Sequence, residues 1–131
     1  MVRVKAEVEV SNIKFETSVL LNTGFGTEEP EALIPIRLAE ALGIELEKAS
    51  PKLYETPGGI TRLFEAEKMA EIKVAGKSVS CNVVISETES EVILSDSAIS
   101  RLEIVIEDPA GGLWRFKGEK RTRKSVRPNY W

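Results

Sequence analysis

The first 21 residues constrain the fold most, because apolar and polar side chains alternate along them. Valine or alanine occupies every second position from Val2 to Val10, and charged residues occupy the positions between. Ser11 and Asn12 then predict a turn, and Ile13 to Leu21 returns as a second strand. A period of two is typical of a strand with one buried face. The chain is therefore predicted to begin with a β-hairpin.

Later segments extend the same pattern and predict a predominantly antiparallel β fold. One short helix is expected from Pro35 to Leu42, stopped by Gly43, and a second after the capping residues Ser95 and Asp96. An extended segment is expected over 44–46, a hairpin over 54–62, and further strands over 64–74, 79–85, 91–94, 103–108 and 113–116.

Composition indicates one soluble domain. The 131 residues contain 42% apolar and 30% charged side chains, an ordinary balance for a globular protein. No apolar run is long enough to cross a membrane, and we expect a cytoplasmic protein. There is no histidine, which excludes Ser-His-Asp nucleophiles and imidazole acid–base catalysis. Cys81 is the only cysteine, and we interpret it as a buried structural residue.

No metal or other cofactor is predicted. Histidine-ligated zinc is excluded by composition. The acidic groups Glu28-Glu29 and Glu87/Glu89/Glu91 are interpreted as solvated loop charges, not as cation ligands.

A polar loop bracketed by glycines follows the second strand. It reads Asn22-Thr23-Gly24-Phe25-Gly26 and comes directly after the apolar run Val19-Leu20-Leu21. Glycine permits backbone angles that other residues avoid, so a buried strand can present one polar side chain to a cavity here.

The loop resembles the Asp-Thr/Ser-Gly loop of aspartic peptidases, with Asn22 at the position of the acid. The chain is similar to the retropepsin-like branch, and most to its single-domain prokaryotic and archaeal members. Three features match in order: the loop with the helix over 34–43, the Pro57-Gly58-Gly59 hairpin where a flap would be, and the 93–96 stretch followed by the strand over 104–106. Ser95 stands where that family usually has glycine.

The resemblance covers residues 2–116 and implies a closed antiparallel β-barrel of the retropepsin type with one or two short helices and a flap hairpin. It also implies a homodimer, because the enzyme needs two loops to activate water between two aspartates. Thr23 would link the loops and Gly24 would offer backbone contacts. The implied substrate-binding residues are Phe25, Gly26, Pro57, Gly58, Gly59 and Ile60.

Asn22 predicts a peptidase fold that is catalytically silent, because an amide cannot accept a proton near neutral pH. Two origins stay open: a substitution introduced to inactivate an enzyme, or a natural loss of catalysis. Two plainer interpretations also stay open, namely a turn asparagine unrelated to catalysis and an ordinary surface hairpin over 54–62.

Residues 117–131 are predicted to form a basic C-terminal tail. They carry six Lys and Arg against one Glu, a side-chain charge of +5. Because the net charge of the whole chain is −3, the preceding 116 residues carry a charge of −8. One alternative function is a naturally inactive peptide-binding or dimerisation module. Another is nucleic-acid association through Lys120, Arg121, Arg123, Lys124 and Arg127, with Tyr130 and Trp131 for stacking. We favour a solvated tail that neutralises the acidic body.

Overall fold

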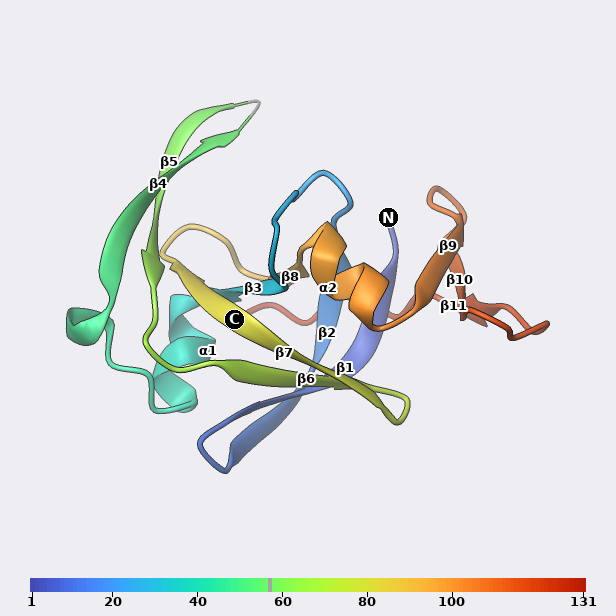
Figure 1. Cartoon of the computed structure of the whole chain (residues 1–131), viewed down its shortest axis with the longest axis horizontal. Helices are drawn as coiled ribbons and strands as arrows, with labels where there is room; N and C mark the ends of the chain where they lie inside the picture. The colour runs from blue at the N-terminus through green and yellow to red at the C-terminus, as the bar shows by residue number, and fades with distance from the viewer. Residues whose placement is uncertain (57) are drawn as a thin grey trace.

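The computed structural model describes residues 1–56 and 58–131, and it is mainly β (Figure 1). The predicted N-terminal hairpin is present as β1 (Arg3–Val10) and β2 (Ile13–Leu21). Its register runs without a break from Arg3 opposite Leu20 to Val10 opposite Ile13. Ser11 and Asn12 turn the chain with φ angles of 47° and 71°, the positive values that a tight two-residue hairpin turn requires.

Six strands close into a barrel, which confirms the predicted fold class. The strand order of the large sheet is β3-β8-β2-β1-β6-β7-β5-β4, and an additional pairing of β3 with β7 completes the ring. Four pairings in the ring are antiparallel, while β2 with β8 and β3 with β7 are parallel. The other strands of this sheet are β3 (Glu31–Pro35), β4 (Ser50–Thr56), β5 (Gly59–Glu65), β6 (Ala70–Val74), β7 (Lys77–Ser86) and β8 (Val92–Leu94).

The core lies inside the barrel and follows the alternation in the sequence. Val4 and Val8 of β1 are completely buried, as are Ile72 of β6 and Leu94 of β8. Each fully buried side chain of this size contributes about 1.5–3 kcal/mol relative to an exposed position. The period of two in the first strand therefore decides which face of the sheet becomes the interior.

Both predicted helices are present and short. Helix α1 (Ile36–Ala41) is followed by Gly43 at φ 79°, and α2 (Asp96–Arg101) follows β8. Two sequence predictions differ in detail. A 3₁₀ turn, η1 (Leu46–Lys48), begins at the end of the expected extended segment over 44–46. The expected strand over 64–74 is divided, since β5 ends at Glu65 and β6 begins at Ala70.

The last strands form a separate three-stranded sheet. It contains β9 (Ile104–Asp108), β10 (Leu113–Phe116) and β11 (Arg123–Lys124), in the order β11-β10-β9. In Figure 1 this sheet lies at the opposite end of the molecule from the β4–β5 hairpin. Residues 117–131 thus include a strand, and the chain beyond that strand is hydrogen-bonded to β1 and β2. Among the described residues, no helix has the length and apolar character needed to span a membrane.

Candidate functional site

Asn22 begins a tight loop at the end of β2. Its backbone N–H donates to the Leu94 carbonyl at 3.2 Å, which fixes the start of the loop to β8. Its side-chain Oδ1 accepts from the Gly24 N–H at 2.9 Å, and its carbonyl accepts from the Phe25 N–H at 3.1 Å. Asparagine commonly stabilises a turn in this way. Among the described residues, Nδ2 of Asn22 has no hydrogen-bond acceptor.

Asp96 fastens the other end of this loop to α2. Its backbone N–H donates to the Phe25 carbonyl at 2.9 Å, and its Oδ1 accepts from the Thr27 N–H at 3.0 Å. The sequence predicts Asp96 only as a capping residue. Its carboxylate also holds the Asn22 loop in place, a contact between residues about 70 positions apart that no local pattern indicates.

Ser95, where the resembling family has glycine, is accommodated without a strained or unpaired hydroxyl. The side chain is fully buried. Its Oγ accepts from the N–H of Ala98 at 3.3 Å, which makes Ser95 the N-cap of α2. The same oxygen accepts from the Glu31 N–H at 3.0 Å. Ser95 therefore joins β3 to α2 directly behind the loop.

A pocket of about 330 Å³ lies between the Asn22 loop and the β4–β5 hairpin. Leu33 and Leu63, which line it, form a small buried apolar cluster with Val84, separate from the barrel core. The pocket combines this apolar floor with a polar rim, as ligand sites commonly do. We call it the cleft; its lining residues are Asn22, Gly24, Phe25, Gly26, Leu33, Tyr54, Glu55, Thr61, Leu63, Ser86, Thr88, Glu89 and Ile93.

The cleft brings together four of the nine predicted site residues, Asn22, Gly24, Phe25 and Gly26. The predicted Thr23 is exposed and does not line it.

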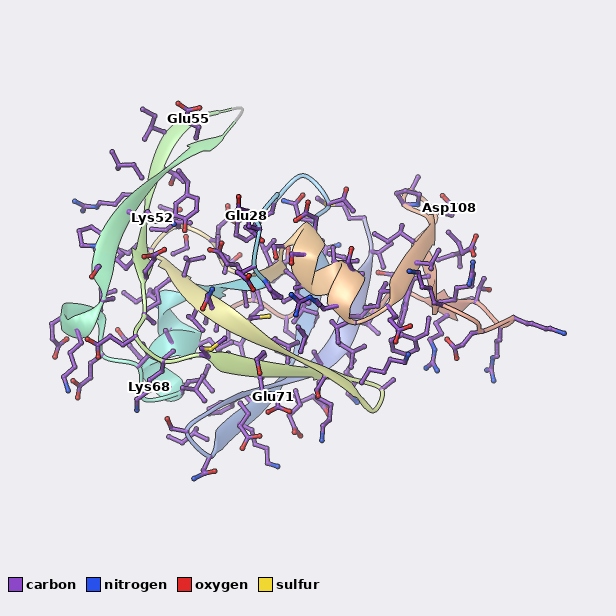
Figure 2. The ribbon with its side chains drawn as sticks, in the orientation of Figure 1. Glu28, Lys52, Glu55, Lys68, Glu71 and Asp108 are labelled. Atoms are coloured by element: carbon purple, nitrogen blue, oxygen red, sulfur yellow. The ribbon has the colours of Figure 1, made fainter. Side chains whose placement is uncertain are left out.

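The predicted flap residues lie at the far end of the hairpin. Among the described residues there, Gly58, Gly59 and Ile60 are exposed and do not line the cleft; Ile60 is 70% exposed. Pro57 lies outside the described residues. In Figure 2, Glu55 marks this end of the hairpin and Lys52 lies nearer to its base.

The hairpin instead contributes Tyr54, Glu55, Thr61 and Leu63 to the lining of the cleft, none of which was among the predicted site residues. The Tyr54 hydroxyl donates to Oε1 of Glu31 at 3.3 Å. Burial raises the pKa of Glu31, while the hydrogen bond from Tyr54 acts in the opposite direction. Burial and the nearby Glu31 carboxylate raise the pKa of Tyr54. Alternation along β4 was the available signal, because it places Tyr54 on the opposite face from Leu53, which is 68% exposed.

Cys81 has the buried structural position that the sequence predicts. Its side chain is completely inaccessible within the barrel core. Burial raises the pKa of the thiol to about 12. A thiol that stays protonated and has no access to solvent cannot act as a nucleophile.

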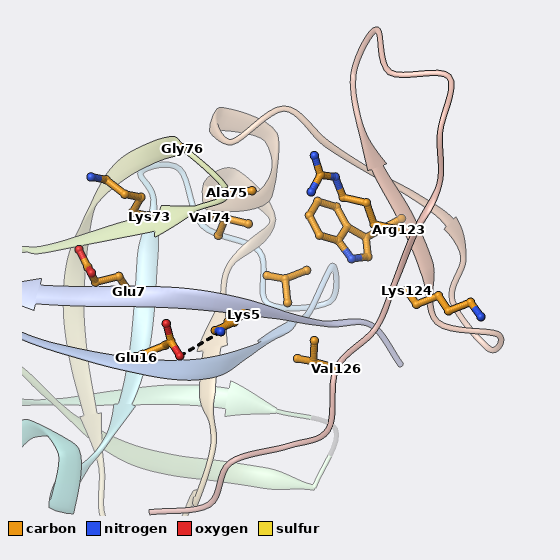
Figure 3. A pocket seen from close by; sticks show the side chains of 12 residues that line it. Lys5, Glu7, Glu16, Lys73, Val74, Ala75, Gly76, Arg123, Lys124 and Val126 are labelled. Carbon is orange, nitrogen blue, oxygen red and sulfur yellow. Dashed lines mark ion pairs between the residues drawn. The ribbon is translucent and has the colours of Figure 1, made fainter.

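A second pocket, of about 420 Å³, lies between the barrel and the three-stranded sheet (Figure 3). Its lining is rich in charged side chains, but these do not converge on one point. Lys5 is paired with Glu16 at 3.1 Å. Figure 3 shows Lys73 and Lys124 on opposite sides of the pocket, directed away from each other. This arrangement offers no combined group of cations to a ligand.

The two aromatic residues at the end of the chain differ in availability. Tyr130 is 68% exposed. Trp131 is half-buried, and its indole packs edge-on against Phe15 with ring centroids 5.9 Å apart. The ring of Trp131 therefore packs within the chain and is less available than Tyr130 for stacking on a nucleic-acid base.

No family model matches this chain, and no curated protein matches it. Within the described residues, there is no group of three or more acidic, cysteine or histidine side chains placed to hold a metal ion.

Proposed function

We propose that this chain is a catalytically silent, retropepsin-like aspartic peptidase that forms a homodimer and binds extended peptides in the cleft. The observation that carries the proposal is the position of Asn22. It stands at the end of a barrel strand, on the lining of an apolar-floored cleft, opposite a hairpin that contributes Tyr54 and Thr61 to the same lining. The acid that would activate water belongs at this point.

The chemistry of the Asn22 amide is the reason why we expect the chain to have no peptidase activity. Its Oδ1 accepts the Gly24 N–H, and its Nδ2 can only donate. A side chain of this kind binds water but does not remove a proton from it. A two-fold axis would place the same amide on both sides of the site, so neither subunit would supply a general base.

Peptide binding does not depend on the missing carboxylate. Leu33 and Leu63, together with Phe25 and Ile93, provide an apolar surface for substrate side chains, and the buried Val84 packs against this surface from within. Exposed Glu55 and Glu89 lie on the rim, and neither has an ion-pair partner among the described residues. We expect the cleft to prefer apolar side chains flanked by basic ones.

The decisive experiment compares this chain with Asn22→Asp on a peptide library between pH 3 and pH 7. We expect cleavage only by the aspartate form, with a rate at least on the order of a hundredfold above that of the parent chain. Asn12→Asp is the matched control, because it makes the same chemical change in the β1–β2 turn, away from the cleft. Sedimentation should give a dimer for all three proteins.

The outcomes separate the possible functions. If neither the parent chain nor the Asn22→Asp variant cuts any peptide, while the parent chain still binds peptides as a dimer, the protein is a naturally inactive binding module. Cleavage by the parent chain at the rate of Asn22→Asp would refute the assignment of the acid position. A monomer that binds no peptide would refute the proposal as a whole.

A further inference from the structure

The last residues of the chain form a strap, defined here as residues 125–131, that crosses from β1 to β2. It begins where the Ser125 N–H donates to the Gly112 carbonyl at 2.7 Å. Ser125 Oγ accepts from the Arg3 N–H at 2.8 Å, and the Val126 N–H donates to the Arg3 carbonyl at 2.9 Å. The strap is therefore fixed along the start of β1.

The strap then forms hydrogen bonds with the open edge of β2. Strand β8 pairs with β2 only from Val19 onward, so in the part of the chain that the structure describes, the preceding residues of β2 have no neighbouring strand on that side. The Asn129 side-chain Oδ1 accepts from the Ser18 N–H at 2.8 Å, and the backbone N–H of Asn129 donates to Ser18 Oγ at 2.7 Å. The Trp131 indole N–H donates to Thr17 Oγ1 at 3.0 Å.

Thr17 and Ser18 are each only 1% exposed, so the strap supplies hydrogen bonds that solvent does not. A buried polar group that loses its partner costs roughly 1–3 kcal/mol. The strap is thus part of the folded structure and not a solvated extension.

The strap ends on a loop that carries part of the cleft lining. The Trp131 backbone N–H donates to the Ser90 carbonyl at 2.9 Å. Ser90 belongs to the segment that joins β7 to β8, which we call the wall loop (residues 86–91, counting the last residue of β7). Three of its members, Ser86, Thr88 and Glu89, line the cleft. Among the described residues, the hydrogen bonds on the cleft side of this loop are local, since Ser86 Oγ accepts from the N–H groups of Thr88 and Glu89 at 3.2 and 2.9 Å.

We propose that Trp131 is a positioning residue for the cleft: through Ser90 it holds the wall loop in the conformation that binds a ligand. For peptide ligands this inference rests on the proposed function. Trp131 contacts Phe15, Thr17 and Ser90 but does not line the cleft. Its effect on binding is therefore transmitted through the wall loop.

The test measures amide hydrogen exchange in the parent chain, Trp131→Ala and Tyr130→Ala. The control residue Tyr130 is adjacent in sequence and largely exposed. We expect Trp131→Ala to accelerate exchange of the Thr88 and Glu89 amides about tenfold, the change that loss of about 1.4 kcal/mol of local stability produces. Tyr130→Ala should leave these amides unchanged. Amides of Val8 and Ile72 report global unfolding and should stay protected in both variants.

A binding measurement connects the wall loop to the ligand. Its probe is a fluorescent version of the peptide that Asn22→Asp cuts fastest. This peptide is titrated into the parent chain and into the variants Trp131→Ala and Trp131→Phe, all of which keep Asn22 and are not expected to cut it. Both variants keep the backbone N–H that donates to Ser90 but lose the indole N–H that donates to Thr17. We expect Trp131→Ala to weaken peptide binding several-fold, and Trp131→Phe, which keeps an aromatic ring, to lie between Trp131→Ala and the parent chain.

Each result decides a different claim. Unchanged exchange of Thr88 and Glu89 in Trp131→Ala would overturn the positioning role. Faster exchange with unchanged peptide affinity would overturn the link to binding. If the parent chain binds no peptide and Asn22→Asp cuts none, the proposed function fails, and the exchange result alone decides whether the strap positions the wall loop.

Discussion

The ion pair between Arg3 and Glu91 offers the sharpest test of how the wall loop is held. Arg3 Nε and Nη2 donate to the two carboxylate oxygens of Glu91 at 2.6 and 3.1 Å. The side chains are only 21% and 12% exposed. The hydrogen bond to Glu91 raises the pKa of Arg3, although desolvation opposes it. This paired arrangement joins β1 to the last residue of the wall loop.

The expected magnitude follows from geometry and burial. Hydrogen bonds to charged groups contribute about 1.5–3 kcal/mol, and exposed ion pairs about 0.2–1 kcal/mol. Because this pair is bidentate and mostly buried, we expect Glu91→Gln to cost about 2 kcal/mol of unfolding free energy. For a chain of this length the loss corresponds to roughly 7 °C in Tm, at about 2.1 cal/mol/K of unfolding entropy per residue.

A double-mutant cycle on Arg3→Met and Glu91→Gln, read by urea unfolding, isolates the coupling between the two side chains. The matched reference is the Lys48–Glu45 pair, at 2.9 Å but with side chains 67% and 53% exposed. We expect a coupling of about 1–2 kcal/mol for the buried pair and less than about 0.5 kcal/mol for the exposed one. Equal couplings would refute the argument that burial and bidentate geometry make the Arg3–Glu91 pair stabilising.

Two further predictions concern single ionisable groups. Cys81 should not react with a thiol reagent in the folded protein, because it is completely buried and its pKa is raised to about 12; rapid labelling without unfolding would contradict this. Glu119 should contribute to acid unfolding, since hydrogen bonds from Arg123 and the Phe116 N–H lower its pKa from 4.5 to about 2. A lowered carboxyl pKa gives stability that is present above pH 4.5 and is lost as the pH falls towards 2. Glu119→Gln should therefore flatten the stability profile in this interval, and an unchanged slope would refute the assignment.

Local sequence determined most of the elements of this protein and the position of its central loop. Alternation from Val2 to Val10 dictates a strand with one apolar face, and side chains of opposite parity point to opposite faces whatever the strand pairs with. The Asn22 loop was recognisable because a polar segment with two glycines follows an apolar run directly. These features depend on neighbours in the chain, so a single sequence reveals them.

Tertiary structure alone decided which distant residues complete the site. Asp96 binds the Thr27 N–H, Tyr54 reaches Glu31, and the wall loop meets the end of the chain at Trp131. The basic composition of residues 117–131 predicted a solvated tail, yet seven of these residues form a strap that satisfies Thr17 and Ser18. Composition reports the charge of a segment but not the hydrogen-bonding groups that another strand leaves unpaired. Those groups exist only once β2 and β8 have paired over part of their length.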